Sequence, residues 1–420
     1  MIDIKLLREQ RDELVKNLQK RQDYDVTVVD KVLSLDSSWR SLKSELDSLK
    51  AQKNKESKAI AEVKKKGGDV QAQLGKVKEI AQAIEKKDEE LSSLETERNE
   101  LLLSIPNMLD EAVPLGADDE ANLVVRTFGE KPQFSFKARN HQEICELKGW
   151  YDLDTAAKAS GARFYYLKGD LVMLELALYQ FVLQKLSKKG YLPVEVPPML
   201  HREAIGKSVC LADFEEVIYK IEDEDLYMVG TSEHALAVLH DSQTFTHKDL
   251  PLKYAGLSPC FRKEAGVTKD SKGIFRVHNF NKIEQFVFSK PEESDKFHEE
   301  ITKNAEEIFQ DLDLHYQIVD ICSGDIGNFA SRKFDLEAWL PGQEKYREMV
   351  SASNYRDYGA RRLNVRFQNE KGELEYVHTL NSTAIALTRC MIAILEQHQL
   401  EDGSVKVPKV LVPFLGKEVL

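Results

Sequence analysis

Residues 258–288 read SPCFRKEAGVTKDSKGIFRVHNFNKIEQFVF, with Phe-Arg-Lys-Glu at 261–264 and Arg-Val-His-Asn-Phe at 276–280. The β-branched and aromatic run at 283–288 predicts a strand, and a loop separates the two charged segments. A single Arg-x-Glu is usually no more than a surface ion pair. The whole pattern has far fewer accidental matches, so the combination is the informative feature.

This pattern resembles motif 2 of the class II aminoacyl-tRNA synthetases, which has Phe-Arg-x-Glu on one antiparallel strand and Arg-x-x-x-Phe on the next. Adenylate formation develops negative charge on the α-phosphate of ATP, and a fixed guanidinium stabilises that charge. The resemblance therefore implies this role for Arg262. It further implies that Glu264 accepts from the adenine amino group, that Arg276 meets the outer phosphates and that Phe280 offers a face to the base.

Two further segments resemble the other motifs of this class. Residues 190–198 (GYLPVEVPP) resemble motif 1, a long helix that runs into a strand, ends at proline and builds the dimer interface. Residues 381–389 (NSTAIALTR) resemble motif 3, whose arginine, here Arg389, closes the other face of the adenine. Alone, 383–399 would indicate only a core helix. The three motifs span about 171–200, 258–288 and 379–399, and no glycine-rich phosphate loop is present.

Within class II, several matches resemble the seryl-tRNA synthetases in particular. Thr231-Ser232-Glu233 resembles the triplet that holds the substrate ammonium group. Glu284 matches the glutamate that accepts the serine hydroxyl, and Thr383 matches a second residue on that hydroxyl. Such a buried acceptor rejects alanine because it would be left unpaired. The expected serine-binding residues are Thr231, Ser232, Glu233, Arg262, Glu284 and Thr383.

The resemblance implies ATP as a substrate and Mg²⁺ as the ion that neutralises its outer phosphates. The expected ATP-binding residues are Arg262, Lys263, Glu264, Val277, Phe280, Glu348, Met349, Val350, Ser351 and Arg389. Glu348 and Ser351 are also the expected Mg²⁺ contacts. The expected catalytic residues are Arg262, Glu264, Arg276 and Arg389. No Cys/His/Glu zinc constellation is identifiable, so no zinc is expected.

Coiled-coil spacing marks the N-terminal quarter of the chain. Apolar residues step by four and three from Val28 to Leu49, Gly67-Gly68-Asp69 interrupts the pattern, and a second seam runs through 70–105. This predicts an antiparallel helical hairpin. Its lysine-rich end could hold phosphates, and the resemblance implies that it reaches the long variable arm of tRNA(Ser). The expected tRNA-binding residues are Lys50, Lys53, Lys55, Lys58, Lys64, Lys65 and Lys66.

The 420 residues are long enough for two domains. We expect an α+β protein, with a coiled-coil tRNA-binding arm at 1–105, a linker at 106–130 and a catalytic domain at 131–420 that has an antiparallel sheet flanked by helices. Within that domain, the alternation at 361–368 and the turn at 370–373 predict an antiparallel hairpin. The net charge of −12 belongs almost entirely to the residues after 110. The first residues hold no apolar core of signal-peptide length, no stretch predicts a membrane span, and the five cysteines are widely separated. A cytoplasmic homodimer is expected.

Two segments depart from the usual seryl pattern. Val350 stands where Glu-Val-Ser-Ser would have a hydroxyl, and 206–214 lacks two glycines and a proline of the usual loop. These departures leave open a specialised paralogue, either inhibitor-tolerant or donating serine to a biosynthetic pathway. A catalytically dead RNA-binding homologue and a class II enzyme for threonine or proline are further alternatives. The main hypothesis is serine activation and transfer to tRNA(Ser), with serine charging of selenocysteine tRNA as a possible addition.

Overall fold

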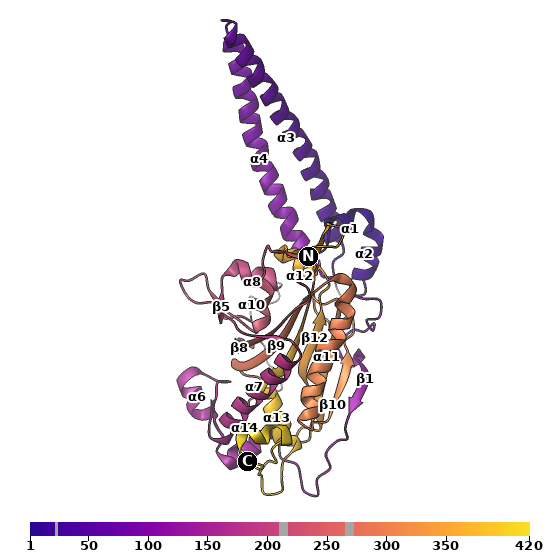
Figure 1. The fold of residues 1–420 in the computed structure, drawn as a ribbon, viewed down its shortest axis with the longest axis vertical. Helices are drawn as coiled ribbons and strands as arrows, with labels where there is room; N and C mark the ends of the chain where they lie inside the picture. Colours follow the sequence, from indigo (N-terminus) through magenta and orange to yellow (C-terminus); the bar gives the residue numbers. More distant parts are fainter. Residues whose placement is uncertain (22–23, 210–216, 265–272) are drawn as a thin grey trace. The chain divides into compact units, whose positions relative to one another are not determined.

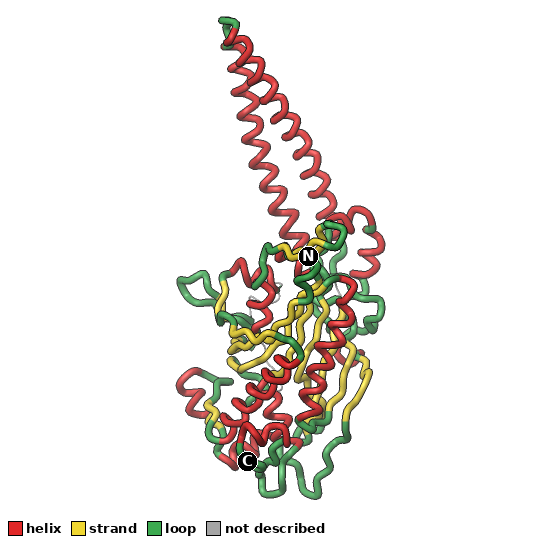
Figure 2. The backbone as a smooth tube through the Cα atoms, viewed as in Figure 1, coloured by secondary structure: helices red, strands yellow, loops and turns green. Residues whose placement is uncertain are grey.

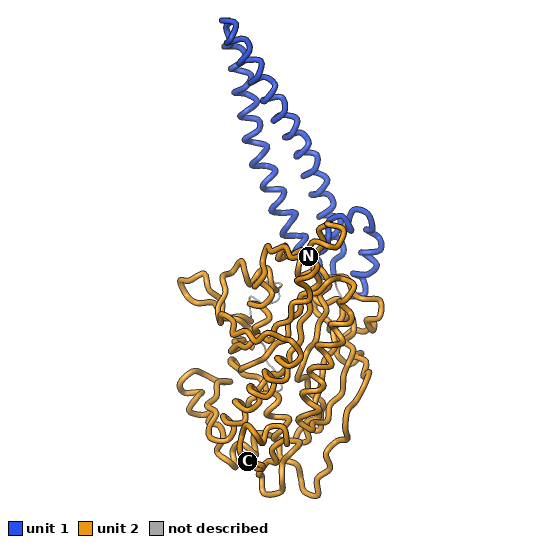
Figure 3. Tube along the Cα trace, in the orientation of Figure 1, with its two compact units in different colours: residues 1–106 blue, residues 107–420 orange. Residues whose placement is uncertain are grey.

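The computed structural model describes residues 1–21, 24–209, 217–264 and 273–420. These residues form two compact units, 1–106 and 107–420 (Figure 3). The loop of the predicted motif 2, at 265–272, lies outside the described residues. So do residues 210–214 of the divergent segment.

The described part of unit 1 is helical (Figure 2). Its helices are α1 (Ile4–Glu9), α2 (Arg11–Leu18), α3 (Thr27–Lys65) and α4 (Gln71–Ser104). The helices α3 and α4 lie side by side and are joined by a turn in which Gly67 has a φ of 76°, a conformation that favours glycine. Leu42 and Leu46 of α3 pack with Ile84 and Leu91 of α4. The predicted coiled-coil hairpin is confirmed.

Unit 2 is built on an eight-stranded sheet (Figure 1). In spatial order its strands are β1 (Leu123–Phe128), β10 (Tyr316–Asp320), β11 (Arg332–Leu340), β12 (Lys345–Asn354), β15 (His378–Ala386), β9 (Asn279–Ser289), β8 (Leu252–Phe261) and β4 (Leu192–Glu195). All neighbouring pairs are antiparallel except β4 and β8, which are parallel. The predicted α+β class with a largely antiparallel sheet is confirmed.

Helices cover the two faces of this sheet unequally. The helices α7 (Asp170–Lys188), α11 (Ser294–Asp311) and α13 (Leu387–Gln397) pack on one face and enclose the main apolar core. On the other face lie α8 (Arg202–Ser208), α10 (Ser232–Val238) and α12 (Tyr358–Leu363), which pack around a smaller core. The shorter helices α8, α10 and α12 leave part of their face uncovered, and the candidate site lies there.

Short elements complete the described part of unit 2. They are α5 (His141–Lys148), α6 (Leu153–Ser160), α14 (Val412–Leu415), the 3-10 turns Asp119–Ala121, Pro291–Glu293 and Lys409–Leu411, and the strands β2 (Tyr151–Asp152), β3 (Tyr166–Leu167), β5 (Met199–Leu200), β6 (Tyr227–Met228), β7 (Thr244–Thr246), β13 (Arg366–Gln368) and β14 (Leu374–Tyr376). In the parts of the chain that the structure describes, no helix is both long and apolar enough to cross a membrane.

Three predicted elements differ in the structure. The segment 106–130, expected to be a linker, contains β1, which extends the sheet edge by pairing with β10. The helix expected over 383–399 begins only at Leu387, because residues 378–386 pair with β9 as a strand. Residues 361–363, expected to be extended, belong to α12. In each case the periodicity of a short apolar run does not distinguish the expected structure from the observed one. Contacts with the rest of the folded chain determine which of the two forms. The hairpin expected around 370–373 is confirmed by the pairing of β13 with β14.

Candidate active site

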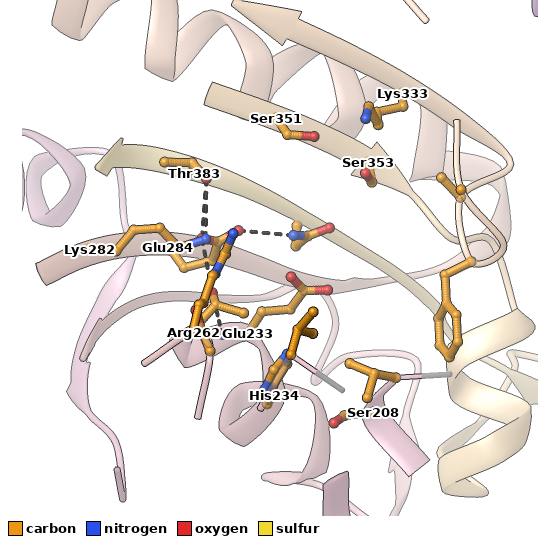
Figure 4. A pocket seen from close by; sticks show the side chains of 18 of the residues that line it. Ser208, Glu233, His234, Arg262, Lys282, Glu284, Lys333, Ser351, Ser353 and Thr383 are labelled. Atoms are coloured by element: carbon orange, nitrogen blue, oxygen red, sulfur yellow. Dashed lines mark hydrogen bonds and ion pairs between the residues drawn. The ribbon is translucent and has the colours of Figure 1, made fainter. Parts of the chain in front are cut away.

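A cavity of about 790 Å³ lies on the α10 side of the sheet (Figure 4). The predicted residues that line it are Thr231, Glu233, Arg262, Glu264, Arg276, Glu284, Glu348, Ser351 and Thr383. A second cavity, of about 50 Å³, is lined by the predicted residues Val277, Phe280, Met349 and Arg389. The two cavities adjoin, since five residues line both: Arg262, Glu264, Lys282, Glu348 and Thr383.

The strand β9 supplies the floor through its two-residue alternation. Phe280, Lys282 and Glu284 face the cavities, whereas Ile283 belongs to the main core and Gln285 hydrogen-bonds to α11 on the opposite face. Successive side chains of a strand point to opposite faces. One strand can therefore contribute both a core and a polar site.

Two β-bulges adjust which side chains reach the cavities. On β12, Leu336 pairs with Val350 but the next residue, Glu337, pairs with Glu348, which leaves Met349 as an extra residue. An extra residue in one strand re-aims the side chains that follow it. Glu348 consequently lines the cavity, whereas the side chain of Val350 is 2 % exposed and packs in the main core. The structure thus does not bring the predicted ATP contact Val350 into either cavity.

The second bulge is on β15. Thr383 pairs with Glu284, and Ile385 pairs with Ile283, so Ala384 is the extra residue. Ala384 and Ile385 both pack in the main core. This bulge lets Thr383 face the cavity at the point where the strand turns towards α13.

Four donors converge on the buried carboxylate of Glu284. Asn381 Nδ2 donates to its Oε1 at 2.9 Å, and the hydroxyls of Thr231 and Thr383 lie 3.4 Å from its Oε2. Lys282 forms an ion pair with the same carboxylate. A buried charge is tolerated when it is paired and hydrogen-bonded. This cluster forms a polar floor of the cavity, where the carboxylate of Glu284 can accept a hydrogen bond from a ligand.

Glu233 stands opposite this floor, on the first turn of α10. The hydroxyl of Tyr355 donates to its Oε1 at 2.6 Å. Burial, together with the charge of Glu284, raises the pKa of Glu233 to about 7. The neighbouring His234 has its pKa lowered to about 3 by burial and by the charges of Arg262 and Lys282, so its imidazole is neutral.

Arg262 lies at the boundary between the two cavities, and Arg276 lines the main one. Arg262 Nε donates to the carbonyl of Gly230 at 3.3 Å, and its guanidinium lies 5.3 Å from the centre of the Phe280 ring. Arg276 Nη1 lies 3.3 Å from Glu264 Oε2. Both guanidinium groups are therefore held by few contacts while they line the main cavity.

Arg389 closes the smaller cavity from α13. Its Nη1 donates to the backbone carbonyl of Glu348 at 2.9 Å and to Glu348 Oε1 at 3.1 Å. Its guanidinium also lies 4.9 Å from the ring centre of Phe275. Arg389 thus links motif 3 to β12.

Two other predicted residues line neither cavity. Ser232 is fully buried, and its hydroxyl donates to the carbonyl of Gly256 at 3.0 Å, which fixes α10 to β8. Lys263 donates its backbone N–H to the carbonyl of Val217 at 2.8 Å. Each directly follows or precedes a residue that does line the cavity, and the backbone geometry turns its own side chain elsewhere.

Several residues that line the main cavity are not among the predicted site residues: Lys282, Asn381, Tyr355, Ser353, Lys333 and His234. A signal existed for three of them. Lys282, Asn381 and Ser353 each lie two residues from a predicted site residue, and the strand period of two would have found them. Lys333 and Tyr355 reach the cavity through the sheet topology, which leaves no local signal. Ser208 and Val209, from the described part of the divergent segment, also line the cavity.

The predicted tRNA-binding lysines lie in the outer half of α3 and at its end. Lys55, Lys58, Lys64, Lys65 and Lys66 are exposed, and Lys53 is partly buried. Lys50 lies further down the shaft, where its Nζ is 3.1 Å from Asp88 of α4. Such exposed pairs contribute little to stability, but Lys50 is less available to an external phosphate.

Comparisons with known proteins agree with one another. Residues 1–109 match the family model of the seryl-tRNA synthetase N-terminal domain, and residues 218–398 match that of the tRNA synthetase class II core domain (G, H, P, S and T). A serine–tRNA ligase of Pyrococcus horikoshii is 47 % identical over 445 residues, which cover 100 % of this chain and 98 % of the relative.

Two solved structures are similar along the whole chain. The crystal structure of seryl-tRNA synthetase from Pyrococcus horikoshii complexed with ATP has a TM-score of 0.93 at 45 % identity, and covers 100 % of this chain and 99 % of that one. The crystal structure of a cytoplasmic serine-tRNA ligase from Naegleria fowleri in complex with AMP has a TM-score of 0.88 at 37 % identity, with 100 % and 98 % covered.

Proposed function

Because this chain belongs to the seryl-tRNA synthetase family, we propose that its two adjoining cavities bind L-serine and ATP and that its hairpin binds the tRNA. The protein is a serine–tRNA ligase, which activates serine with ATP and transfers it to tRNA. The observation that carries the assignment of the serine site is the cluster around Glu284. Pyrophosphate exchange with ATP, measured across the twenty amino acids, tests it. Exchange with serine alone supports the assignment, and exchange with none would indicate a protein that only binds RNA.

Serine fits the main cavity through two groups. Its ammonium group pairs with Glu233, close to the hydroxyl of Thr231. Its side-chain hydroxyl donates to Glu284 and lies beside Thr383. Alanine would leave the Glu284 acceptor unpaired, and a site that hydrogen-bonds a substrate hydroxyl rejects the analogue without it by about 10⁴-fold.

The reaction needs no covalent bond to the protein. The serine carboxylate attacks the α-phosphate of ATP, pyrophosphate leaves, and the adenylate then passes its seryl group to the tRNA. Arg262 stands where the two cavities meet, so its guanidinium stabilises the charge that develops on the α-phosphate. Phe280 and Arg389 line the smaller cavity and would bracket the adenine ring.

Magnesium fits the donors on β12. The carboxylate of Glu348 and the hydroxyl of Ser351 line the same cavity, and Mg²⁺ prefers oxygen ligands from one or two carboxylates together with substrate phosphates. These residues would hold the ion through ATP, and the ion would neutralise the outer phosphates. In the described ranges no cluster of three His, Cys, Asp or Glu side chains is placed to hold a metal.

The pH dependence of serine binding follows from Glu233. Only its charged form pairs with the ammonium group, and its pKa is raised to about 7 in the folded protein. We therefore expect the KM for serine to rise as the pH falls through about 7, whereas the KM for ATP changes much less. Pyrophosphate exchange from about pH 6 to about pH 8.5 measures both. A serine KM that stays flat over this range would remove Glu233 as the ammonium partner.

The lysines of the hairpin end are proposed to bind the tRNA backbone. Changing Lys55, Lys58, Lys64, Lys65 and Lys66 to glutamine should weaken tRNA charging and leave serine-dependent exchange intact. Each lost phosphate contact should lower the slope of log affinity against log salt by about 0.7–0.9. Charging assays at several salt concentrations measure this effect.

A matched control replaces Lys43 and Lys87, which pair with Asp47 and Glu45 on the shaft of the hairpin. Their replacement should change the salt slope little. If the control weakens charging as much as the variant of the hairpin end, the interaction is not localised at that end.

A homodimer is proposed through motif 1. Met173 and Leu176 of α7 and Leu192 of the edge strand β4 are 49 %, 55 % and 59 % exposed. The helix α7 packs beside β4, so these apolar side chains belong to one region. Clustered exposed apolar residues are typical of an interaction surface.

A further inference from the structure

Lys282 is a buried cation between the two cavities. Its side chain is 8 % exposed and lines both of them. Its Nζ forms an ion pair with Glu284 and donates to the hydroxyl of Thr383 at 3.3 Å. Figure 4 shows Lys282 and Glu284 side by side on one strand, with Thr383 on the next. Lys282 therefore holds together the two residues proposed to bind the serine hydroxyl.

The charges around this lysine are unevenly distributed. Glu284 lies beside it on β9, Glu233 faces it from α10, and Arg262, which follows β8, acts on Glu233 together with it. The same cavity is also lined by the charged residues Glu264, Arg276, Lys333 and Glu348. Two further titratable groups of the cavity, His234 and Tyr355, are neutral at physiological pH. Lys282 and Arg262 thus both act on the carboxylate of Glu233, and Lys282 also pairs with the carboxylate of Glu284.

This balance matters because an uncompensated buried charge is costly. Removing one partner of a buried ion pair typically costs several kcal/mol, since the remaining charge keeps its desolvation penalty. Lys282 contributes to the balance in two ways. It pairs directly with Glu284, and its charge opposes the upward shift in the pKa of Glu233 that burial and Glu284 cause.

Resting on the proposed function, we propose that Lys282 is a positioning residue that sets selectivity for a hydroxyl-bearing amino acid. Its ammonium group orients Glu284 and Thr383 towards the substrate hydroxyl. Its charge also favours the ionised form of Glu233, the residue proposed to pair with the substrate ammonium group. Lys282 acts through these carboxylates and takes no part in the bond-making step.

Two substitutions separate the charge of Lys282 from its hydrogen bond. Lys282→Met removes both, whereas Lys282→Gln keeps a donor for Thr383. In pyrophosphate exchange, Lys282→Met should raise the KM for serine at least about tenfold and lower the preference for serine over alanine by about tenfold or more, with the KM for ATP within about threefold. The pH below which serine binding weakens should move upward by about half to one unit in both variants. The loss of preference should be smaller in Lys282→Gln.

The control is Lys185→Met, which removes a lysine paired with Asp311 between α7 and α11, away from both cavities. It should leave the preference and the pH dependence as they are. An unchanged preference in Lys282→Met, or equal rises in the KM for serine and for ATP, would overturn the proposal. The latter result would indicate a purely structural role.

A double variant keeps the test decisive if the single variants fold poorly. Lys282→Met combined with Glu284→Gln removes both charges, so it should melt at a higher temperature than Lys282→Met alone. A double variant no more stable than the single one would overturn the charge-pairing argument. The unmodified protein distinguishes failure of the proposed function from failure of the proposed role of Lys282. If it activates no amino acid, the proposed function fails. If it activates serine and the variants keep its selectivity, only the role of Lys282 fails.

Discussion

Glu284→Ala is expected to abolish the preference for serine over alanine. In the folded protein this carboxylate is 1 % exposed and gathers Asn381, Thr231, Thr383 and Lys282 around it. Its removal takes away the acceptor for the substrate hydroxyl and adds space at the floor of the cavity. Discrimination on the order of 10⁴-fold should fall to a factor of a few.

The measurement is kcat/KM for serine and for alanine in pyrophosphate exchange. A matched control is Glu175→Ala, because Glu175 contacts the same strand from the opposite face, where its carboxylate accepts from Asn281 at 3.0 Å. The control should retain the preference for serine. If Glu284→Ala also retains it, the hydroxyl acceptor lies elsewhere in the cavity.

Arg262→Ala is expected to reduce serine-dependent pyrophosphate exchange by about 10²–10³-fold, since loss of one preorganised donor to a developing charge costs about 3–4 kcal/mol. The fold should survive. The side-chain contacts of Arg262 are one hydrogen bond to the Gly230 carbonyl and its contact with the Phe280 ring, just beyond the end of β8 and outside the apolar core. Circular dichroism and thermal melting check the fold independently of the exchange rate.

A control with similar contacts is Arg366→Ala. Arg366 also stacks on a ring and forms one hydrogen bond, both with Tyr376, but it lines neither cavity. Its loss should affect stability more than the exchange rate. Exchange by Arg262→Ala within about threefold of the unmodified protein would exclude Arg262 from the reaction.

The parts of the fold that repeat a pattern were predictable from the sequence. The hairpin α3–α4 has a sustained apolar period, which needs no tertiary information. The antiparallel core was predictable because the motif residues resemble those of a known class, and periodicity alone did not separate strand from helix at 378–386. The edge strand β1 could not be foreseen for a related reason: its residues become a strand only by pairing with β10, nearly two hundred residues later.

The residues of the candidate site divide in the same way, into those that belong to a motif and those that only the folded sheet brings to the cavity. Residues inside a recognisable motif, such as Arg262 and Glu284, line the main cavity. Neighbours taken along with a motif, such as Ser232 and Val350, do not, because a motif written as consecutive letters ignores which face each side chain occupies. Tyr355 and Lys333 belong to no quoted motif and reach the cavity only through the folded sheet.

The β-bulges at Met349 and Ala384 limit how this site could be rebuilt in another protein. If the same residues were placed on a regular antiparallel ladder, Glu348 would turn towards the core and the helix that follows β15 would begin out of phase. The two extra residues, Met349 and Ala384, are therefore part of what builds the site, although the letters of a motif do not show that they form bulges.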